Sequence, residues 1–158
     1  MERSRSRRVW LAASVFIVMV QAVVPQRVGA QWGTEIVPGL RFGPPLRAGL
    51  AVALAYGQRD SLSQFAGAIA LVEPGIGGAR GSIGYIIAGP FASALEVLGS
   101  AVRTWGSPAQ VARNRTLVGG EVRVAYFAVN VGIGVFQPVA GFGDDRRLRY
   151  YLNVGLGI

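Results

Sequence analysis

The end of the chain, residues 146–158, alternates between two kinds of side chain. One series is apolar: Leu148, Tyr150, Leu152, Val154, Leu156 and Ile158. The other is polar or small: Arg147, Arg149, Tyr151, Asn153, Gly155 and Gly157. Successive residues of a β-strand point to opposite faces, so this pattern predicts a strand with one apolar and one polar-to-small face. A helix would mix the two series on every side.

Composition excludes several function classes. Of the 158 residues, 51% are hydrophobic and 15% are charged, which indicates one domain that is unusually apolar for a protein surrounded only by water. The chain has no cysteine and no histidine, so disulfides, thiol nucleophiles and every Ser/His/Asp arrangement are excluded. We therefore expect no enzymatic activity, no cofactor and no metal site.

The amino-terminal thirty residues are typical of a secretory signal. A basic segment, 1–8, precedes an apolar run, Val9–Val24, and Val28-Gly29-Ala30 ends in a small residue. We expect cleavage after Ala30, giving residues 1–30 as signal peptide and 31–158 as the exported domain. An uncleaved anchor helix is the alternative, because the run is near the lower limit for spanning a bilayer.

The net charge of +8 does not indicate nucleic-acid binding. Half of it belongs to the signal, and the other arginines are spread along the chain, whereas nucleic-acid-binding proteins gather their cations into a patch.

Turn-forming clusters divide the domain into about eight candidate strands. Examples are Gly43-Pro44-Pro45, Glu73-Pro74-Gly75 and Gly106-Ser107-Pro108. The expected strands are 34–43, 46–57, 65–72, 77–88, 91–105, 116–128, 130–141 and 146–158. The polar stretch from Gly106 to Arg115 is expected to be a surface loop.

The two faces of these strands distinguish a membrane barrel from a soluble one. In 46–57 a bulky face of Leu46, Leu50, Val52, Leu54 and Tyr56 opposes Arg47 and a run of Gly and Ala. A soluble sheet shows a richly charged face to water, but here the second face is small with isolated charges. The pattern predicts an all-β, antiparallel, up-and-down barrel of about eight strands, with apolar residues facing lipid and a lumen filled by side chains.

Charges inside so narrow a barrel need partners, because an unpaired buried charge is costly. We predict that the polar face forms a structural network inside the lumen, in which Arg123 and Arg149 neutralise Glu121. Its predicted members are Arg47, Glu121, Arg123, Arg147, Arg149, Tyr151 and Asn153.

Aromatic residues near the segment ends are expected to form girdles at the two membrane surfaces. They are Trp32, Phe42, Phe65, Phe91, Trp105, Phe136 and Tyr150.

Three motifs resemble parts of known binding or catalytic sites, but a simpler structural explanation fits each of them. The run 75–81 is glycine-rich, but Arg80 replaces the last glycine of a dinucleotide fingerprint, and a strand bulge or hairpin explains it better. Asp144-Asp145 lacks the spacing of a calcium loop and indicates a solvated turn. Glu96 and Glu121 resemble an acid/base pair, but nothing in the sequence places them together.

From Leu46 onward, the glycine-rich hairpins and the alternating final strand resemble the small eight-stranded outer-membrane barrels of Gram-negative bacteria. Within that superfamily, the run 117–121 and the ending 155–158 look like those of uncharacterised exported barrel-like proteins. The resemblance implies an outer-membrane location, contact with membrane lipid and recognition by the outer-membrane assembly machinery. The superfamily normally ends in an aromatic residue, and Ile158 departs from this.

The leading hypothesis is a non-enzymatic integral outer-membrane barrel with a structural or loop-mediated role and no small-molecule substrate. One alternative is a helical inner-membrane protein with Ile83–Val102 as its best span, which Pro90 and Glu96 interrupt. The other is a soluble periplasmic barrel that binds a small apolar ligand in its interior.

Overall fold

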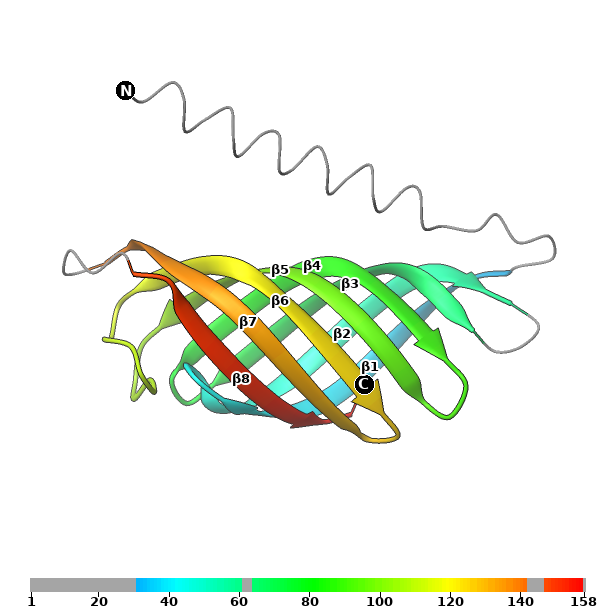
Figure 1. Cartoon of the computed structure of the whole chain (residues 1–158), viewed down its shortest axis with the longest axis horizontal. Coiled ribbons are helices and arrows are strands. Elements are labelled where there is room, and N and C mark those ends of the chain that lie inside the picture. Colours follow the sequence, from blue (N-terminus) through cyan, green and yellow to red (C-terminus); the bar gives the residue numbers. More distant parts are fainter. Residues whose placement is uncertain (1–30, 61–63, 142–146, 158) are drawn as a thin grey trace, which may run out of the picture.

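A computed structural model of the chain describes residues 31–60, 64–141 and 147–157, which form one closed antiparallel barrel of eight strands in sequential order (Figure 1). The strands are β1 (Gln31–Gly43), β2 (Arg47–Arg59), β3 (Phe65–Gly75), β4 (Gly78–Gly89), β5 (Ser93–Thr104), β6 (Thr116–Tyr126), β7 (Val129–Ala140) and β8 (Arg149–Leu156). Each overlaps an expected strand, so the predicted fold class is confirmed. The cleavage site after Ala30, Asp144-Asp145 and Ile158 lie outside the described residues.

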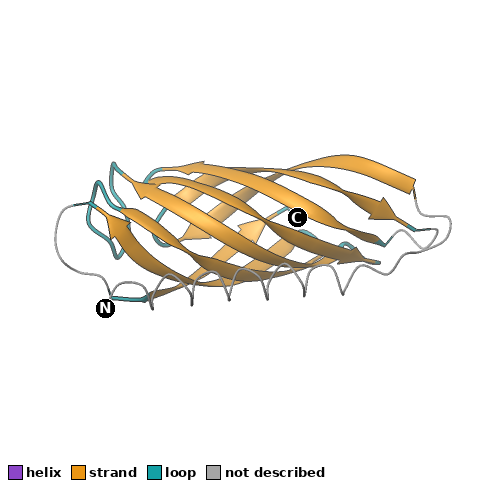
Figure 2. Cartoon of the chain, turned by 90° about the horizontal axis from the view of Figure 1, so that it is seen from above, coloured by secondary structure: helices purple, strands orange, loops and turns teal. Residues whose placement is uncertain are grey.

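The helical alternative is wrong for the described part of the chain. The segment Ile83–Val102 forms most of β4, the turn around Pro90 and most of β5, and strands account for all the regular structure in Figure 2. No helix among the described residues is long and apolar enough to cross a membrane. The apolar run that suggested a span is two half-apolar strands joined by a turn.

The strand registers fix the geometry of the barrel. Cross-strand partners can be followed once around the barrel, starting at Trp32 on β1 and returning to β1 at Phe42. The residues passed on β2 to β8 are Gln58, Ala66, Ile87, Leu95, Val124, Val131 and Val154. One circuit therefore advances ten residues along β1, from 32 to 42. Eight strands with this stagger are tilted by about 40° from the barrel axis, within the range typical of barrels. The same stagger makes the strand ends step along the axis (Figure 1).

The barrel has two distinct ends. The terminal end carries Gln31, Gly157 and the connections β2–β3, β4–β5 and β6–β7. The loop end carries the connections β1–β2, β3–β4, β5–β6 and β7–β8, of which the β5–β6 and β7–β8 connections are the longest. Figure 1 places the loop end at the left and the terminal end at the right.

Most large apolar side chains face outward, as the alternation predicts, and the inward face carries small and charged residues together with larger apolar ones such as Ile69, Leu71 and Leu98. In β8, Leu152 and Val154 are exposed, whereas Tyr151 and Asn153 are buried. In β2, Leu50 and Leu54 are exposed while Ala53 and Ala55 are buried. Inward-facing glycines leave room for long polar side chains.

The alternation predicted for 46–57 is wrong at its first two residues. Leu46 is buried inside the barrel and Arg47 is exposed. The cause is a three-residue turn: Arg47 has a φ of 65°, and the Ala48 amide donates to the Leu46 carbonyl at 2.9 Å. This turn reverses the alternation, so Leu46 faces the lumen and Arg47 leaves the predicted network.

Outward-facing polar residues of the strands lie at two levels of the barrel. Near the terminal end they are Thr34, Gln58 and Ser93, and near the loop end they are Arg103, Thr116 and Gln137. With about 3.3 Å per residue along a strand and about 4.8 Å between strands, these levels lie roughly 30 Å apart along the axis. Between them, the outward residues of all eight strands are aliphatic, aromatic, Gly or Pro. The barrel therefore has a continuous apolar band.

Candidate functional site

The centre of the lumen holds a compact network of three glutamates and three arginines. These are Arg41 from β1, Glu73 from β3, Arg80 from β4, Glu96 from β5, and Glu121 and Arg123 from β6. All six are buried, and the three positive charges balance the three negative ones. We call this set the lumen network.

Glu73 is one hub of the lumen network. It is fully buried, and its carboxylate lies 2.7 Å from Arg41 Nε, 3.3 Å from Arg80 Nε and 3.1 Å from Arg123 Nη2. Arg80 is its direct cross-strand partner in the β3–β4 hairpin, while Arg41 and Arg123 reach it across the lumen. This carboxylate therefore links three strands besides its own.

Arg123 is the second hub, and it contacts all three glutamates. Its Nε donates to Glu121, its Nη2 lies 3.1 Å from Glu73, and its Nη1 lies 3.6 Å from Glu96. Glu121 also accepts from Arg80 Nη1 at 2.7 Å. The structure thus brings Glu96 and Glu121 to the same guanidinium, which suits charge compensation better than proton transfer between two carboxylates.

Glycines and amides complete the surroundings of the lumen network. A Cβ at Gly132 would lie 2.7 Å from Glu121 Oε1 and 2.8 Å from Arg123 Cγ, so the bare β7 backbone makes room for this pair. Asn130 accepts from Arg41 Nη1 at 2.7 Å and donates to the Gly157 carbonyl. The small inner face is therefore the space that the network fills.

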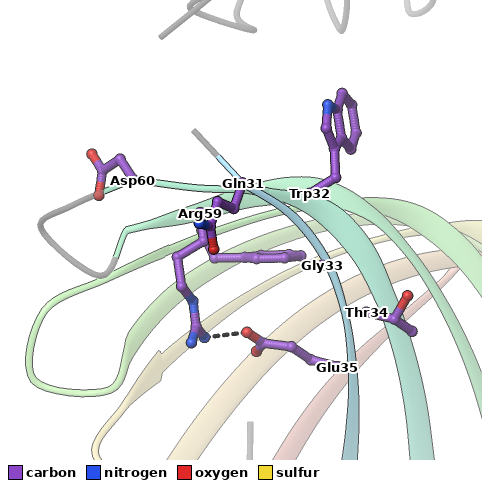
Figure 3. Close-up of a pocket in the computed structure, with 8 residues that line it drawn as sticks. Gln31, Trp32, Gly33, Thr34, Glu35, Arg59 and Asp60 are labelled. Atoms are coloured by element: carbon purple, nitrogen blue, oxygen red, sulfur yellow. Dashed lines mark hydrogen bonds and ion pairs between the residues drawn. The ribbon is translucent and has the colours of Figure 1, made fainter. Parts of the chain in front are cut away.

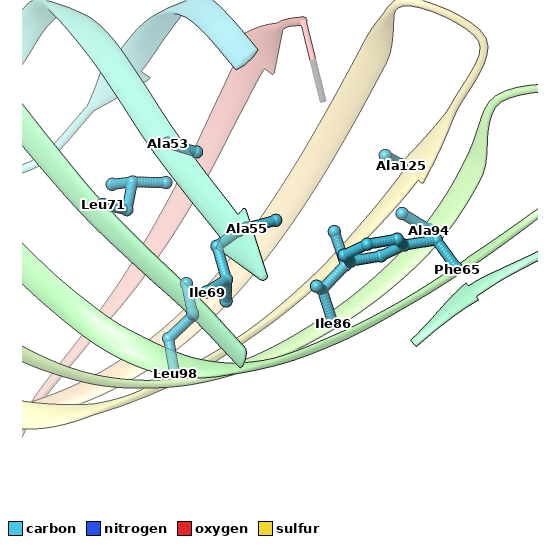
Figure 4. Packing of buried hydrophobic residues seen from close by; sticks show 9 residues of the cluster. All are labelled: Ala53, Ala55, Phe65, Ile69, Leu71, Ile86, Ala94, Leu98 and Ala125. Atoms are coloured by element: carbon cyan, nitrogen blue, oxygen red, sulfur yellow. The ribbon is translucent and has the colours of Figure 1, made fainter. Parts of the chain in front are cut away.

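Apolar layers enclose the lumen network on both sides. Towards the loop end lie Leu46, Val102, Leu117, Phe136 and Tyr151, with the Arg80 guanidinium 5.6 Å from the centre of the Phe136 ring. Towards the terminal end lies a second cluster, shown in Figure 4, of Ala53, Ala55, Phe65, Ile69, Leu71, Ile86, Ala94, Leu98 and Ala125. Both layers exclude water from the charges between them.

The β5–β6 connection covers the loop end of the lumen. The Ala109 amide donates to the Pro45 carbonyl, Thr104 Oγ1 donates to the Ala112 carbonyl at 2.9 Å, and Arg149 donates to the Gln110 carbonyl. Val111 packs against the apolar layer beneath. The predicted surface loop is therefore a cap that is tied to its neighbours.

The terminal end is hollowed by a cavity of about 540 Å³, shown in Figure 3. Residues of β1, the end of β2 and the start of β3 line it: Gln31, Trp32, Gly33, Thr34, Glu35, Arg59, Asp60 and Phe65. An ion pair joins Arg59 to Glu35. Phe65 belongs to the buried cluster next to the cavity, which indicates a shallow mouth and not a through-channel.

The residues predicted for the polar face lie at different depths. Glu121, Arg123, Tyr151 and Asn153 face the lumen and are buried, and Glu121 pairs with Arg123. Arg149 is half-buried at the loop end, where it bonds to the cap instead of Glu121. Arg147 and Arg47 are exposed, because both lie next to connections of the loop end.

The predicted polar network missed four members of the lumen network: Arg41, Glu73, Arg80 and Glu96. Arg41 lies between outward-facing Leu40 and Phe42, so the alternation already indicated that Arg41 faces the lumen. Glu73 and Arg80 are symmetric about the Ile76-Gly77 turn, so reading the run 75–81 as a tight hairpin would have paired them.

Two of the expected girdle residues are inside the barrel. Phe65 and Phe136 are buried in the lumen, whereas Trp32, Phe42, Phe91, Trp105 and Tyr150 are exposed near the ends of strands. The terminal end has three further exposed aromatic residues, Tyr56, Tyr126 and Phe127. Trp32 stacks on Tyr56 there, with ring centres 5.3 Å apart.

We predict that the folded protein carries no steady ion current in a planar bilayer. The cap, the two apolar layers and the lumen network fill the lumen between the loop end and the cavity at the terminal end, so hydrated ions have no continuous path. Single-channel recording measures this, and steady porin-sized currents would contradict the prediction.

No group of carboxylates among the described residues is arranged to hold a metal ion. Comparison of the chain with protein-family models, with curated proteins and with solved structures found no match. The functional conclusion therefore depends on the geometry of the barrel itself.

Proposed function

We propose that the chain is a non-enzymatic integral outer-membrane β-barrel with a structural or loop-mediated role. One observation carries the proposal: the polarity of the barrel is the reverse of that of a soluble protein. Thirty large hydrophobic side chains are exposed among the described residues, while six charged side chains are compensated inside. Soluble monomers rarely expose contiguous apolar patches beyond a few hundred Å².

The dimensions of the exterior support the same proposal. Membrane barrels have an apolar band about 25 Å tall with aromatic girdles at both edges. Here the polar levels lie roughly 30 Å apart, and exposed aromatic residues lie towards both of them. A closed barrel also satisfies its backbone hydrogen bonds within the sheet, which the hydrocarbon core requires of any spanning structure.

The lumen does not favour the soluble ligand-binding alternative. A carrier of a small apolar ligand needs an apolar cavity with a few placed polar groups. In this barrel the centre holds six charges, and the described mouth is lined by Glu35, Arg59 and Asp60. The apolar surface lies on the outside, where lipid and not a small ligand would cover it.

Membrane fractionation combined with gel mobility tests the proposal. We expect the exported protein to remain in the membrane pellet after a carbonate wash and to change gel mobility on boiling, because a closed barrel resists detergent until its strands separate. The matched control is the same sample left unheated. Release by carbonate, with one mobility before and after boiling, would contradict the proposal.

A further inference from the structure

The loop end of the barrel has an excess of arginine. The described arginines there are Arg47, Arg103, Arg113, Arg115, Arg147 and Arg149, whereas the described carboxylates lie elsewhere, in the lumen network or at the terminal end. Arg146 and the pair Asp144-Asp145 belong to the β7–β8 connection in the sequence. Counting them leaves seven arginines against two carboxylates, so this end is strongly cationic.

Four of these arginines are exposed, Arg147 among them, and we call the other three the arginine rim: Arg47, Arg103 and Arg113. Arg103 is the outward-facing residue where β5 leaves the apolar band, directly above Ala101 and Gly99 on the same face. Its guanidinium donates to Thr116 Oγ1 at 2.9 Å, and the half-exposed Trp105 follows two residues later. Arginine beside an aromatic residue at the edge of an apolar band is typical of headgroup depth.

We propose that the arginine rim binds the phosphate groups of anionic lipid headgroups in the leaflet around the loop end. Guanidinium groups bind phosphate oxygens in a bidentate manner, and each exposed cation near an anionic membrane surface favours association by about fivefold. The inference rests on the proposed function, because only an inserted barrel brings headgroups to this level.

The spacing of the rim favours many headgroups over one soluble anion. Arg47 begins β2 and Arg103 lies one residue before the end of β5, so three strand intervals, about 14 Å along the barrel wall, separate their positions. The Arg103 guanidinium is bonded to Thr116 of β6, which lies on the opposite side of β5 from β2, so it does not converge with Arg47 on one phosphate. A ring of lipids around the barrel supplies a separate phosphate to each of them.

Spin-label spectroscopy tests the inference on the full chain in phosphatidylcholine vesicles. The probes are spin-labelled phosphatidic acid and spin-labelled phosphatidylcholine, and the measurement is the fraction of each that the protein immobilises. The test variant carries Arg47→Gln, Arg103→Gln and Arg113→Gln, and the control carries Arg59→Gln, an exposed arginine of the terminal end. None of the four belongs to the lumen network.

We expect the wild-type protein and the control to prefer phosphatidic acid by about fivefold or more, and the triple variant to lose most of that preference. An equal preference in the triple variant would overturn the inference. So would a loss of preference caused by inorganic phosphate but not by chloride at the same ionic strength, because it would indicate a compact site for free phosphate. Immobilisation of neither probe would instead overturn the proposed function.

Discussion

Replacing Ile133 with arginine is expected to destabilise the folded barrel by about 2–4 kcal/mol in lipid vesicles, whereas Val139→Arg is expected to cost about 0–1 kcal/mol. Both side chains face outward from β7 and are similarly exposed, at 62% and 59%. Ile133 lies near the middle of the apolar band, and Val139 lies at the loop end. A charge at the bilayer centre loses its hydration, while one at the surface keeps it.

The two substitutions are matched in strand, face and residue type, so the contrast isolates depth. Equilibrium unfolding in urea, with the protein folded into vesicles, gives both free energies. A water-exposed barrel would tolerate the two changes equally, within about 0.5 kcal/mol, because isolated surface substitutions rarely matter. Equal free energies for the two variants would therefore remove the main support for a lipid-facing exterior.

The sequence predicted the barrel because strand alternation is a local property. In each alternating stretch, such as 148–156, the sequence alone shows which residues share a face, whatever the neighbouring strands are. The same local reading failed at Arg47, where a single residue with positive φ reverses the alternation. It also misplaced Phe65 and Phe136, since an aromatic residue near a strand end can face either lipid or lumen.

The partners within the lumen could not be predicted in the same way. Which charges meet depends on the stagger of the closed barrel, and this emerges only when all eight registers are known. The stagger places Arg41 and Glu73, from strands that are not neighbours, 2.7 Å apart. It also carries Arg149 to the loop end, away from Glu121, although both face inward.

Replacing Arg123 with leucine is expected to be the most destabilising change in the lumen, with a loss of about 3–5 kcal/mol in the free energy of unfolding. Arg123 is 1% exposed and contacts Glu73, Glu96 and Glu121. Its removal leaves three carboxylates around two arginines, and Glu96 loses its only described ion-pair partner. Leucine also fills less of the lumen than arginine does, which adds to the loss.

The terminal end provides the matched control. Arg59→Leu removes an arginine from an ion pair with Glu35, but Arg59 is 54% exposed, so the expected loss is about 0–1 kcal/mol.

Glu121→Gln is expected to lower the free energy of unfolding by an amount between the losses for Arg123→Leu and Arg59→Leu. The reason is that Arg80 and Arg123 both keep Glu73 as a partner. The measurement is the melting temperature, which we expect to be lower than that of the wild-type protein.

A double variant separates lost charge balance from lost packing. If charge balance dominates, adding Glu96→Gln to Arg123→Leu should recover part of the stability, because it restores two arginines to two carboxylates in a buried site where uncompensated charge is costly. If packing dominates, the second change should recover nothing. An Arg123→Leu variant as stable as Arg59→Leu would show that the lumen network does not stabilise the barrel, and that another feature of the small inner face holds the strands in register.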